Sequence, residues 1–411
     1  MGILMAAFTD YARPYHGVLH ESRVMTPRRI GRRICIVLLG SLALALAPEL
    51  ATAQSTVPFI DELPSHEFLV VGYGTAGWQL TANGATQNTF FGSLSPLFLF
   101  QFGDHFLYEA ELEFDIEEGV TNTSLEYAQI DFFLNDQLTL VAGKFLVPFG
   151  VFGERLHPTW INKLPSRPPL YGHGGESGPQ PLLPILADFG VMLRGSWDLG
   201  KGKGITGSAY VTQGPSVEGA HGEEEENHGG GLIPEFQFGE DVTDINNDKM
   251  LGGRLALVLA PSFEIDLSGF TGEFDDDGSR LNAYNVAAEY RFGSTEFRGE
   301  GFIMRYDFGE AEDHDDGATD EHAERVTAET GGFYVQASHR IGPWEPIIRW
   351  TRRSDATAAT FDTDAGYSQL TFGLDYWFAP SIALMAGLEL NDSRSHEEVP
   401  NRFVVHWAFG F

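Results

Sequence analysis

Two segments of the chain gather carboxylate and imidazole side chains, the groups that proteins use to bind metal ions. They lie around residues 221–228 and 310–324. Oxygen and imidazole ligands suit Ca²⁺, Mg²⁺ and Zn²⁺. The candidate ligands are His221, His228, Asp313, His314 and His322. Their spacing matches no metal motif, and acidic runs are more often solvated loops than sites. We therefore predict no cofactor, apart from weak capture of Ca²⁺ or another divalent cation on these loops.

A second set of carboxylates shares one face of a predicted strand. Between Phe106 and Glu117, apolar residues alternate with acidic ones. The acidic residues are Glu109, Glu111, Glu113 and Asp115. Period-two spacing places the two kinds on opposite faces of the strand. Unpaired carboxylates cannot enter a dry core, because each buried ion costs several kcal/mol. The acidic face must therefore meet water.

Arginines occupy candidate inward positions on other predicted strands. They are Arg194, Arg254, Arg340, Arg349, Arg353 and Arg402. Facing the acidic row across an aqueous interior, they would create a transverse field, since charged rings set ion selectivity. The alternative is that these charges merely solvate the interior. The chain has 58 Asp and Glu against 26 Lys and Arg, a formal net charge of −32. This excess favours cations and argues against nucleic acid as a partner.

Catalytic motifs are missing from the sequence. It contains no Gly-x-Ser-x-Gly elbow, no His-Glu-x-x-His pair and no P-loop. Gly72, Gly74 and Gly77 are spaced like part of a dinucleotide fingerprint, but they lie in a predicted strand with no helix after it. We predict that the protein is not an enzyme.

The N-terminal region predicts export. Arginines at 28, 29, 32 and 33 precede an apolar run over 34–47, and Ala51-Thr52-Ala53 forms a cleavage site. The run is shorter than the ~20 residues of a membrane-spanning helix. We predict an N-terminal extension and signal peptide over residues 1–53 and a single domain over 54–411. The only cysteine, Cys35, lies in the segment to be removed.

The rest of the chain predicts about sixteen strands. Short turns, such as Ala260-Pro261-Ser262, alternate with long connections near 77–88, 148–184 and 309–330. Outer-membrane barrels have short periplasmic turns and long external loops, and sixteen strands enclose an aqueous channel. The predicted fold class is all-β, a transmembrane antiparallel β-barrel of about 16 strands in the bacterial outer membrane.

Two predicted strands need comment. In strand 295–308, Phe302, Met304, Tyr306 and Phe308 are predicted to face outward, although charged residues share their parity, so we predict a bulge near 299–301. The last strand alternates aromatic residues and ends the chain at Phe411. Its terminal Phe resembles the assembly signal of outer-membrane barrels. That resemblance implies the barrel assembly machinery as a partner, with outer-membrane lipid and lipopolysaccharide around the barrel.

The long Pro-rich connection at 148–184 resembles the third loop of sixteen-stranded porins, which folds into the barrel and narrows the pore. Loops of such length are usually functional or disordered, and the alternative is a disordered or cell-surface loop. Its candidate constriction residues are Glu154, Arg155, His157, Lys163 and Arg167.

The segment Tyr127-Ala128-Gln129-Ile130-Asp131, followed by Gly143-Lys144-Phe145-Leu146-Val147-Pro148-Phe149-Gly150, resembles the phosphate-selective porin O and P family. The resemblance implies a homotrimeric, sixteen-stranded porin. Anion selectivity does not follow, because it needs a ladder of basic residues and this chain has few lysines.

These observations predict an outer-membrane porin, a passive diffusion channel for small hydrophilic solutes or ions that prefers cations. One alternative is a metal-binding or adhesive surface barrel that acts through the acidic, His-rich loops. A lesser alternative is an outer-membrane barrel enzyme.

Overall fold

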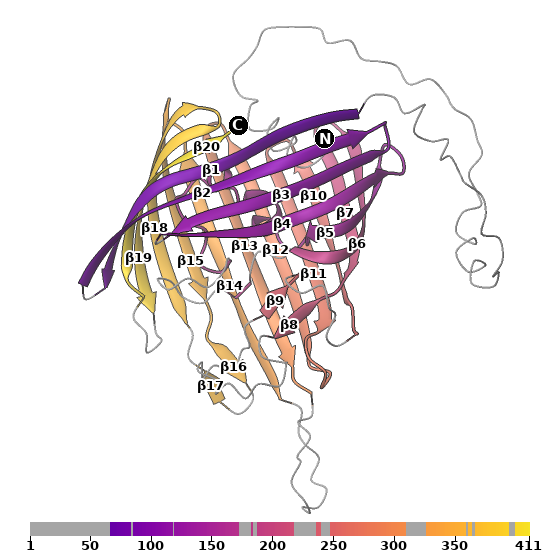
Figure 1. The fold of residues 1–411 in the computed structure, drawn as a ribbon. Coiled ribbons are helices and arrows are strands. Elements are labelled where there is room, and N and C mark those ends of the chain that lie inside the picture. Colours follow the sequence, from indigo (N-terminus) through magenta and orange to yellow (C-terminus); the bar gives the residue numbers. More distant parts are fainter. Residues whose placement is uncertain are drawn as a thin grey trace, which may run out of the picture. The chain divides into compact units, whose positions relative to one another are not determined.

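The computed structural model describes residues 66–83, 85–117, 119–171, 182–183, 187–217, 236–239, 247–309, 326–358, 361–363, 366–393 and 399–411 (Figure 1). The predicted signal peptide lies outside these residues, and so do the candidate metal ligands His221, His228, Asp313, His314 and His322. The predictions made for them remain predictions.

Sixteen long strands of the described residues form one antiparallel sheet. They are β1 (His66–Asn83), β2 (Ala85–Phe102), β3 (Phe106–Glu117), β4 (Val120–Phe133), β5 (Leu138–Leu146), β6 (Ala187–Gly200), β7 (Lys203–Thr212), β10 (Met250–Ala260), β11 (Phe263–Glu273), β12 (Arg280–Phe292), β13 (Thr295–Asp307), β14 (Thr327–His339), β15 (Trp344–Arg353), β18 (Tyr367–Ala379), β19 (Ile382–Ser393) and β20 (Asn401–Gly410). Each pairs with the next along the chain, and β20 pairs with β1 from Tyr73↔Gly410 to Ala82↔Asn401. The sheet is therefore a closed barrel, and the predicted fold class is confirmed.

Short elements extend this barrel. The strands β16 (Ala356–Ala358) and β17 (Phe361–Thr363) form a hairpin that joins the sheet beside β14, and β8 (Pro215–Val217) pairs with β9 (Phe236–Phe238). Between β5 and β6 lie the π-helical turn η1 (Phe152–Leu156) and the short helix α2 (Thr159–Asn162). No helix in the described part of the chain is long and apolar enough to cross a membrane.

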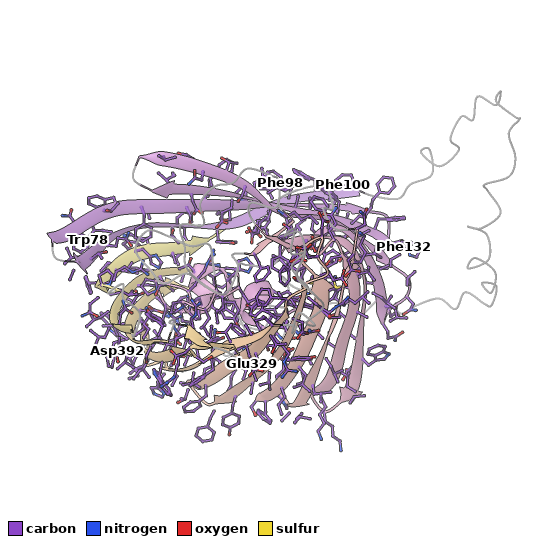
Figure 2. All side chains as sticks on the ribbon, turned by 90° about the horizontal axis from the view of Figure 1, so that it is seen from below. Trp78, Phe98, Phe100, Phe132, Glu329 and Asp392 are labelled. Carbon is purple, nitrogen blue, oxygen red and sulfur yellow. The ribbon has the colours of Figure 1, made fainter. Side chains whose placement is uncertain are left out.

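Alternation along the strands explains why they close into a barrel. On β12, Tyr284, Val286 and Phe292 are exposed, whereas Asn285 and Ala287 are buried. The exposed apolar side chains repeat around the sheet, and Figure 2 shows the wall as a ring with side chains on both faces. A closed sheet leaves no unpaired strand edge for lipid to meet. The outer apolar face therefore suits a bilayer, as predicted.

The first hairpin is longer than predicted. The pattern predicted strands at 66–76 and 89–102 with a connection over 77–88, but β1 and β2 stay paired to Asn83↔Ala85. The tip is rich in Thr, Gln and Asn. Backbone pairing does not require apolar side chains, so the loss of alternation there did not end the strands.

The bulge predicted in β13 is wrong. Its register with β12 and β14 is continuous from Thr295 to Asp307. Phe302, Met304 and Tyr306 are buried, whereas Ile303 is exposed, so the aromatic residues face inward with the charged ones. The reason is that other rings cover them. Phe302 lies 6.3 Å from Phe149 and 5.7 Å from Tyr171, and Tyr306 stacks 5.6 Å from Phe236, all between ring centroids.

Candidate functional site

The segment at 147–171, hereafter the inner loop, lies inside the barrel. Glycines on the wall make room for it: a Cβ added to Gly332, Gly373 or Gly387 would meet Leu170, Leu164 or Pro165, respectively. Trp160 in turn lies against Gly410 of the last strand. The inner loop therefore touches β14, β18, β19 and β20. The prediction that this connection enters the barrel holds for its described part.

One attachment of the inner loop is made through Glu300 on β13. Its carboxylate accepts hydrogen bonds from the backbone N–H groups of Val151 (2.9 Å) and Phe152 (3.0 Å). Asn285 donates a third bond, at 2.9 Å, and holds the carboxylate in place. The backbone N–H of Gly150 donates to Ser268 at 2.8 Å. These bonds satisfy the backbone groups at the start of η1, which would otherwise be costly to bury.

A second attachment is made through Lys163, directly after α2. Its Nζ lies 3.1 Å from Glu296 Oε2 and 3.0 Å from Glu345 Oε1, and it donates to Ser338 Oγ at 3.2 Å. The three partners stand on β13, β15 and β14, so one ammonium joins three neighbouring strands. Lys163 has a φ of 66°, a left-handed conformation that is costly for a residue with a Cβ.

Arg349 on β15 makes a third attachment. It donates to the carbonyl oxygens of Ser166 (3.1 Å) and Arg167 (3.0 Å). Gln336 adds a bond to the carbonyl of Asn162, at 3.2 Å. The predicted pore-lining Arg349 is thus buried beneath the inner loop and orders its backbone.

The turn η1, near the start of the inner loop, is also fixed by charge pairs. Glu154 contacts Arg254 on β10, and Arg254 also reaches Asp266 Oδ2 at 2.5 Å. Arg155 lies 2.5 Å from Glu264 on β11. Both arginines of this group have carboxylate partners, and three carboxylates against two guanidinium groups leave this side of the loop slightly acidic.

The acidic row on β3 faces the barrel interior, on the other side of the inner loop. Tyr73 donates to Glu111 Oε1 at 2.6 Å, and Arg167 lies 3.7 Å from Glu113. Asp115 is exposed and Glu109 half-buried. Exposure therefore falls to a minimum at Glu111 and rises again at Glu109, so Glu111 is the most buried residue of the row.

The remaining arginines are spread around the wall and are not gathered opposite the acidic row. Arg194 pairs with Asp131 (2.7 Å), and Arg402 pairs with Glu389 (2.9 Å). Arg340 lies in the turn after β14, with its guanidinium 5.0 Å from the centre of the Trp377 ring. Arg353 ends β15 on the face that carries Arg349. This arrangement differs from the single arginine cluster that a simple transverse field needs.

Sequence reasoning missed several charged residues that hold the inner loop or pair with the inward-facing arginines. They are Asp131, Glu264, Asp266, Glu296, Glu300 and Glu345. For Asp131, Glu264 and Glu345, alternation within the strands was a sufficient signal. For Glu296 and Glu300 alternation was not a sufficient signal. Aromatic residues that resemble lipid-facing ones share their face of β13.

His157 lies in the inner loop, outside the membrane-spanning strands. Burial, with the Arg167 guanidinium nearby, lowers the pKa of its imidazole to about 3. The ring is therefore neutral near pH 7. As for metals, the described part of the chain has no group of three or more His, Cys, Asp or Glu side chains placed to hold an ion.

Comparisons with known proteins support the fold and not a family. No protein-family model matches the sequence, and no curated protein matches it. The resemblance to the phosphate-selective porin O and P family thus remains a prediction.

Solved structures do match. The outer membrane channel DcaP of Acinetobacter baumannii is 10% identical at a TM-score of 0.52, over 84% of this chain and 97% of that one. An anion-selective porin from Comamonas acidovorans is 12% identical at 0.50, over 84% and 100%. OmpT of Vibrio cholerae, an outer membrane protein described in a trimer form, is 9% identical at 0.50, over 85% and 100%. With its apolar outer face and charged interior, the chain therefore has the fold of the outer-membrane porins, a closed sixteen-stranded barrel of the bacterial outer membrane.

Proposed function

We propose that the protein is a porin, a passive diffusion channel for small hydrophilic solutes or ions that prefers cations. The observation that carries this proposal is the acidic row of β3, which faces the barrel interior beside the inner loop. A wet, charged interior inside an apolar outer wall is the arrangement that a diffusion channel requires.

The charge balance along this row supports cation preference. Glu109, Glu111, Glu113 and Asp115 stand on β3, and Asp131 stands on β4. The cations in contact with them are Arg167 and Arg194. A narrow passage lined with excess negative charge concentrates cations and repels anions.

The partners are proposals as well. The likeness to an outer membrane protein in a trimer form supports a homotrimer. Outer-membrane lipid and lipopolysaccharide would surround the exposed apolar face. Phe411, exposed at the end of the last strand, would present the signal to the barrel assembly machinery.

The test is single-channel conductance of the folded protein in a planar lipid bilayer, with the reversal potential measured under a KCl gradient. We expect stable conductance steps in groups of three and a reversal potential on the K⁺ side. The double variant Glu113→Gln, Asp115→Asn should move that potential toward zero. A folded, inserted barrel without conductance would overturn the porin proposal, and a reversal potential on the Cl⁻ side would overturn only the cation preference.

Deletion of residues 218–230 and 309–326 separates the porin from a surface barrel that acts through its acidic loops. We expect the deletions to leave the conductance steps in place. If the unaltered protein does not conduct, and the deletions abolish an adhesive or metal-binding activity, the surface-barrel alternative is the correct one.

A further inference from the structure

Tyr73 on β1 is the centre of a small polar group at the most buried residue of the acidic row, Glu111. Its hydroxyl donates to Glu111 Oε1 on β3 at 2.6 Å. Its ring lies 6.3 Å, edge to face, from that of His157 in the inner loop. Its cross-strand partner on β2 is Ser95, so the two side chains share the inner face. We call these four residues the Tyr73 centre.

Three atoms of the Tyr73 centre are buried and make no hydrogen bond of normal geometry among the described residues, although the Tyr127 hydroxyl stands near Glu111 as its cross-strand neighbour. The three atoms are Ser95 Oγ, Glu111 Oε2 and His157 Nε2. Their residues are 0%, 1% and 4% exposed, respectively. Buried polar atoms are nearly always hydrogen-bonded in proteins, because leaving one unpaired is costly. Here they come from three separate elements and meet around one tyrosine.

The hydrogen-bonding sense of these atoms follows from their neighbours. His157 Nδ1 lies 2.7 Å from the carbonyl oxygen of Gly153. A carbonyl can only accept, so Nδ1 carries the hydrogen and Nε2 presents a lone pair. Because burial lowers the pKa of His157 to about 3, the ring keeps this lone pair near pH 7. In its ionised form Glu111 can only accept, so its Oε2 then presents a second acceptor to a donor.

The surrounding charge has the sign that a cation needs. Glu113 follows Glu111 on the same face of β3, and the buried Glu126 stands beside them on β4, where a bulge turns both Glu126 and Tyr127 inward. Arg167 lies 3.7 Å from Glu113, so a nitrogen cation already rests among these acids. The Lys144 ammonium also acts on Glu126, so these three carboxyl groups face two cations and remain one charge in excess when all are ionised.

We propose that the Tyr73 centre is a binding subsite for a small solute that carries a protonated amine. The N–H groups of the solute donate to the acceptors Glu111 Oε2 and His157 Nε2, with the Ser95 hydroxyl as a third partner. The positive charge of the solute favours the ionised form of Glu111. This inference rests on the proposed porin function and names its solute class: primary ammonium compounds, in preference to quaternary ones without N–H donors.

The test compares two monovalent cations as inhibitors of K⁺ current through single channels, ethylammonium and tetramethylammonium. Both carry one charge, but only ethylammonium has N–H donors. We expect ethylammonium to inhibit with an apparent Kd at least tenfold lower, and Glu111→Gln to abolish that difference. The matched control is Asp115→Asn, which removes a charge from the same row at an exposed position and should retain the difference.

A second variant and a second measurement keep the outcomes distinct. Ser95→Ala removes one unpartnered hydroxyl without adding bulk, and we expect it to weaken ethylammonium inhibition. It provides the test if Glu111→Gln fails to fold. Conductance with equal inhibition by both cations in the unaltered protein would overturn the subsite and leave the porin proposal standing.

If the folded barrel does not conduct, calorimetric titration of the detergent-solubilised protein with ethylammonium tests the subsite alone. Heat of binding that is lost in Glu111→Gln would support the subsite even though the porin proposal had failed. No heat of binding would overturn it.

Discussion

The ammonium of Lys163 lies 3.0 Å from a carboxylate oxygen of Glu345, and this ion pair joins the inner loop to the barrel wall. Both side chains are almost excluded from water, at 5% and 4% exposure. Glu296 shares the same ammonium. Removing one partner of a buried pair leaves an uncompensated charge, which is far more costly than losing an exposed pair.

Lys163→Met should therefore weaken the barrel strongly. The change leaves Glu296 and Glu345 without their shared cation, and we expect a loss of about 3–5 kcal/mol in the free energy of unfolding. It should also release the inner loop to trypsin at Arg155. Urea unfolding in lipid vesicles measures the first effect and limited proteolysis the second. The control is Arg305→Met, which breaks an exposed pair with Glu329 and should cost no more than about 1 kcal/mol. Equal effects of the two substitutions would contradict a fastening role for Lys163.

Gly150→Ala should loosen the start of η1. Gly150 has a φ of +69°, and an added Cβ would overlap a carboxylate oxygen of Glu300. The strained backbone costs about 1–2 kcal/mol, and Glu300 would have to leave the N–H groups of Val151 and Phe152. We expect faster proteolysis of the inner loop and larger current fluctuations. Gly153→Ala is the matched control, because a Cβ there meets no atom within 4 Å. The prediction fails if both variants behave like the unaltered protein.

Acid should favour displacement of the inner loop through His157. The pKa of His157 is about 3 in the packed loop, below its ordinary value of 6.5. Between these two pH values the displaced loop therefore binds a proton and the packed loop does not. The packed state keeps its full stability above pH 6.5 and loses about 1.4 kcal/mol for each pH unit below it, until pH 3. Proteolysis of the inner loop between pH 7 and 4 measures this. In His157→Phe the rate of proteolysis should depend less steeply on pH. Identical curves of proteolysis against pH for the two proteins would rule out a contribution from His157.

Charge on the outer face should be tolerated only near the strand ends. Val286 is exposed at the middle of β12, and Phe292 is exposed at its end. In a bilayer we expect Val286→Arg to cost about 2–4 kcal/mol and Phe292→Arg about 0–1 kcal/mol. Unfolding in vesicles of defined thickness compares the two. A Val286→Arg barrel as stable as the Phe292→Arg barrel would mean that this face does not meet hydrocarbon.

Alternation along the strands was enough to predict the barrel. On β12, β15 and β18 the exposed and buried faces are those that the sequence indicates. On β13 it failed, because Phe302 and Tyr306 resemble lipid-facing residues although the inner loop and Phe236 cover them. Strand alternation separates two faces, but it cannot show what fills the space between opposite walls. That depends on contacts between residues far apart in the chain.

The same long-range contacts prevented prediction of the site. The row from Glu109 to Asp115 was visible in the sequence, but its most buried point was not. That point depends on Tyr73 from β1, Ser95 from β2 and His157 from the inner loop, which meet only when the barrel is closed.

Trp160 lies against Gly410, a residue of the strand that seals the barrel to β1. The inner loop precedes β10 to β20 in the chain, yet those strands form most of its surroundings. In the closed barrel each long strand is hydrogen-bonded to both neighbours, so the loop cannot pass between the strands of the wall. The inner loop can therefore reach its final packing only when β10 to β20 are in place, so ordering of the loop and formation of the barrel are coupled.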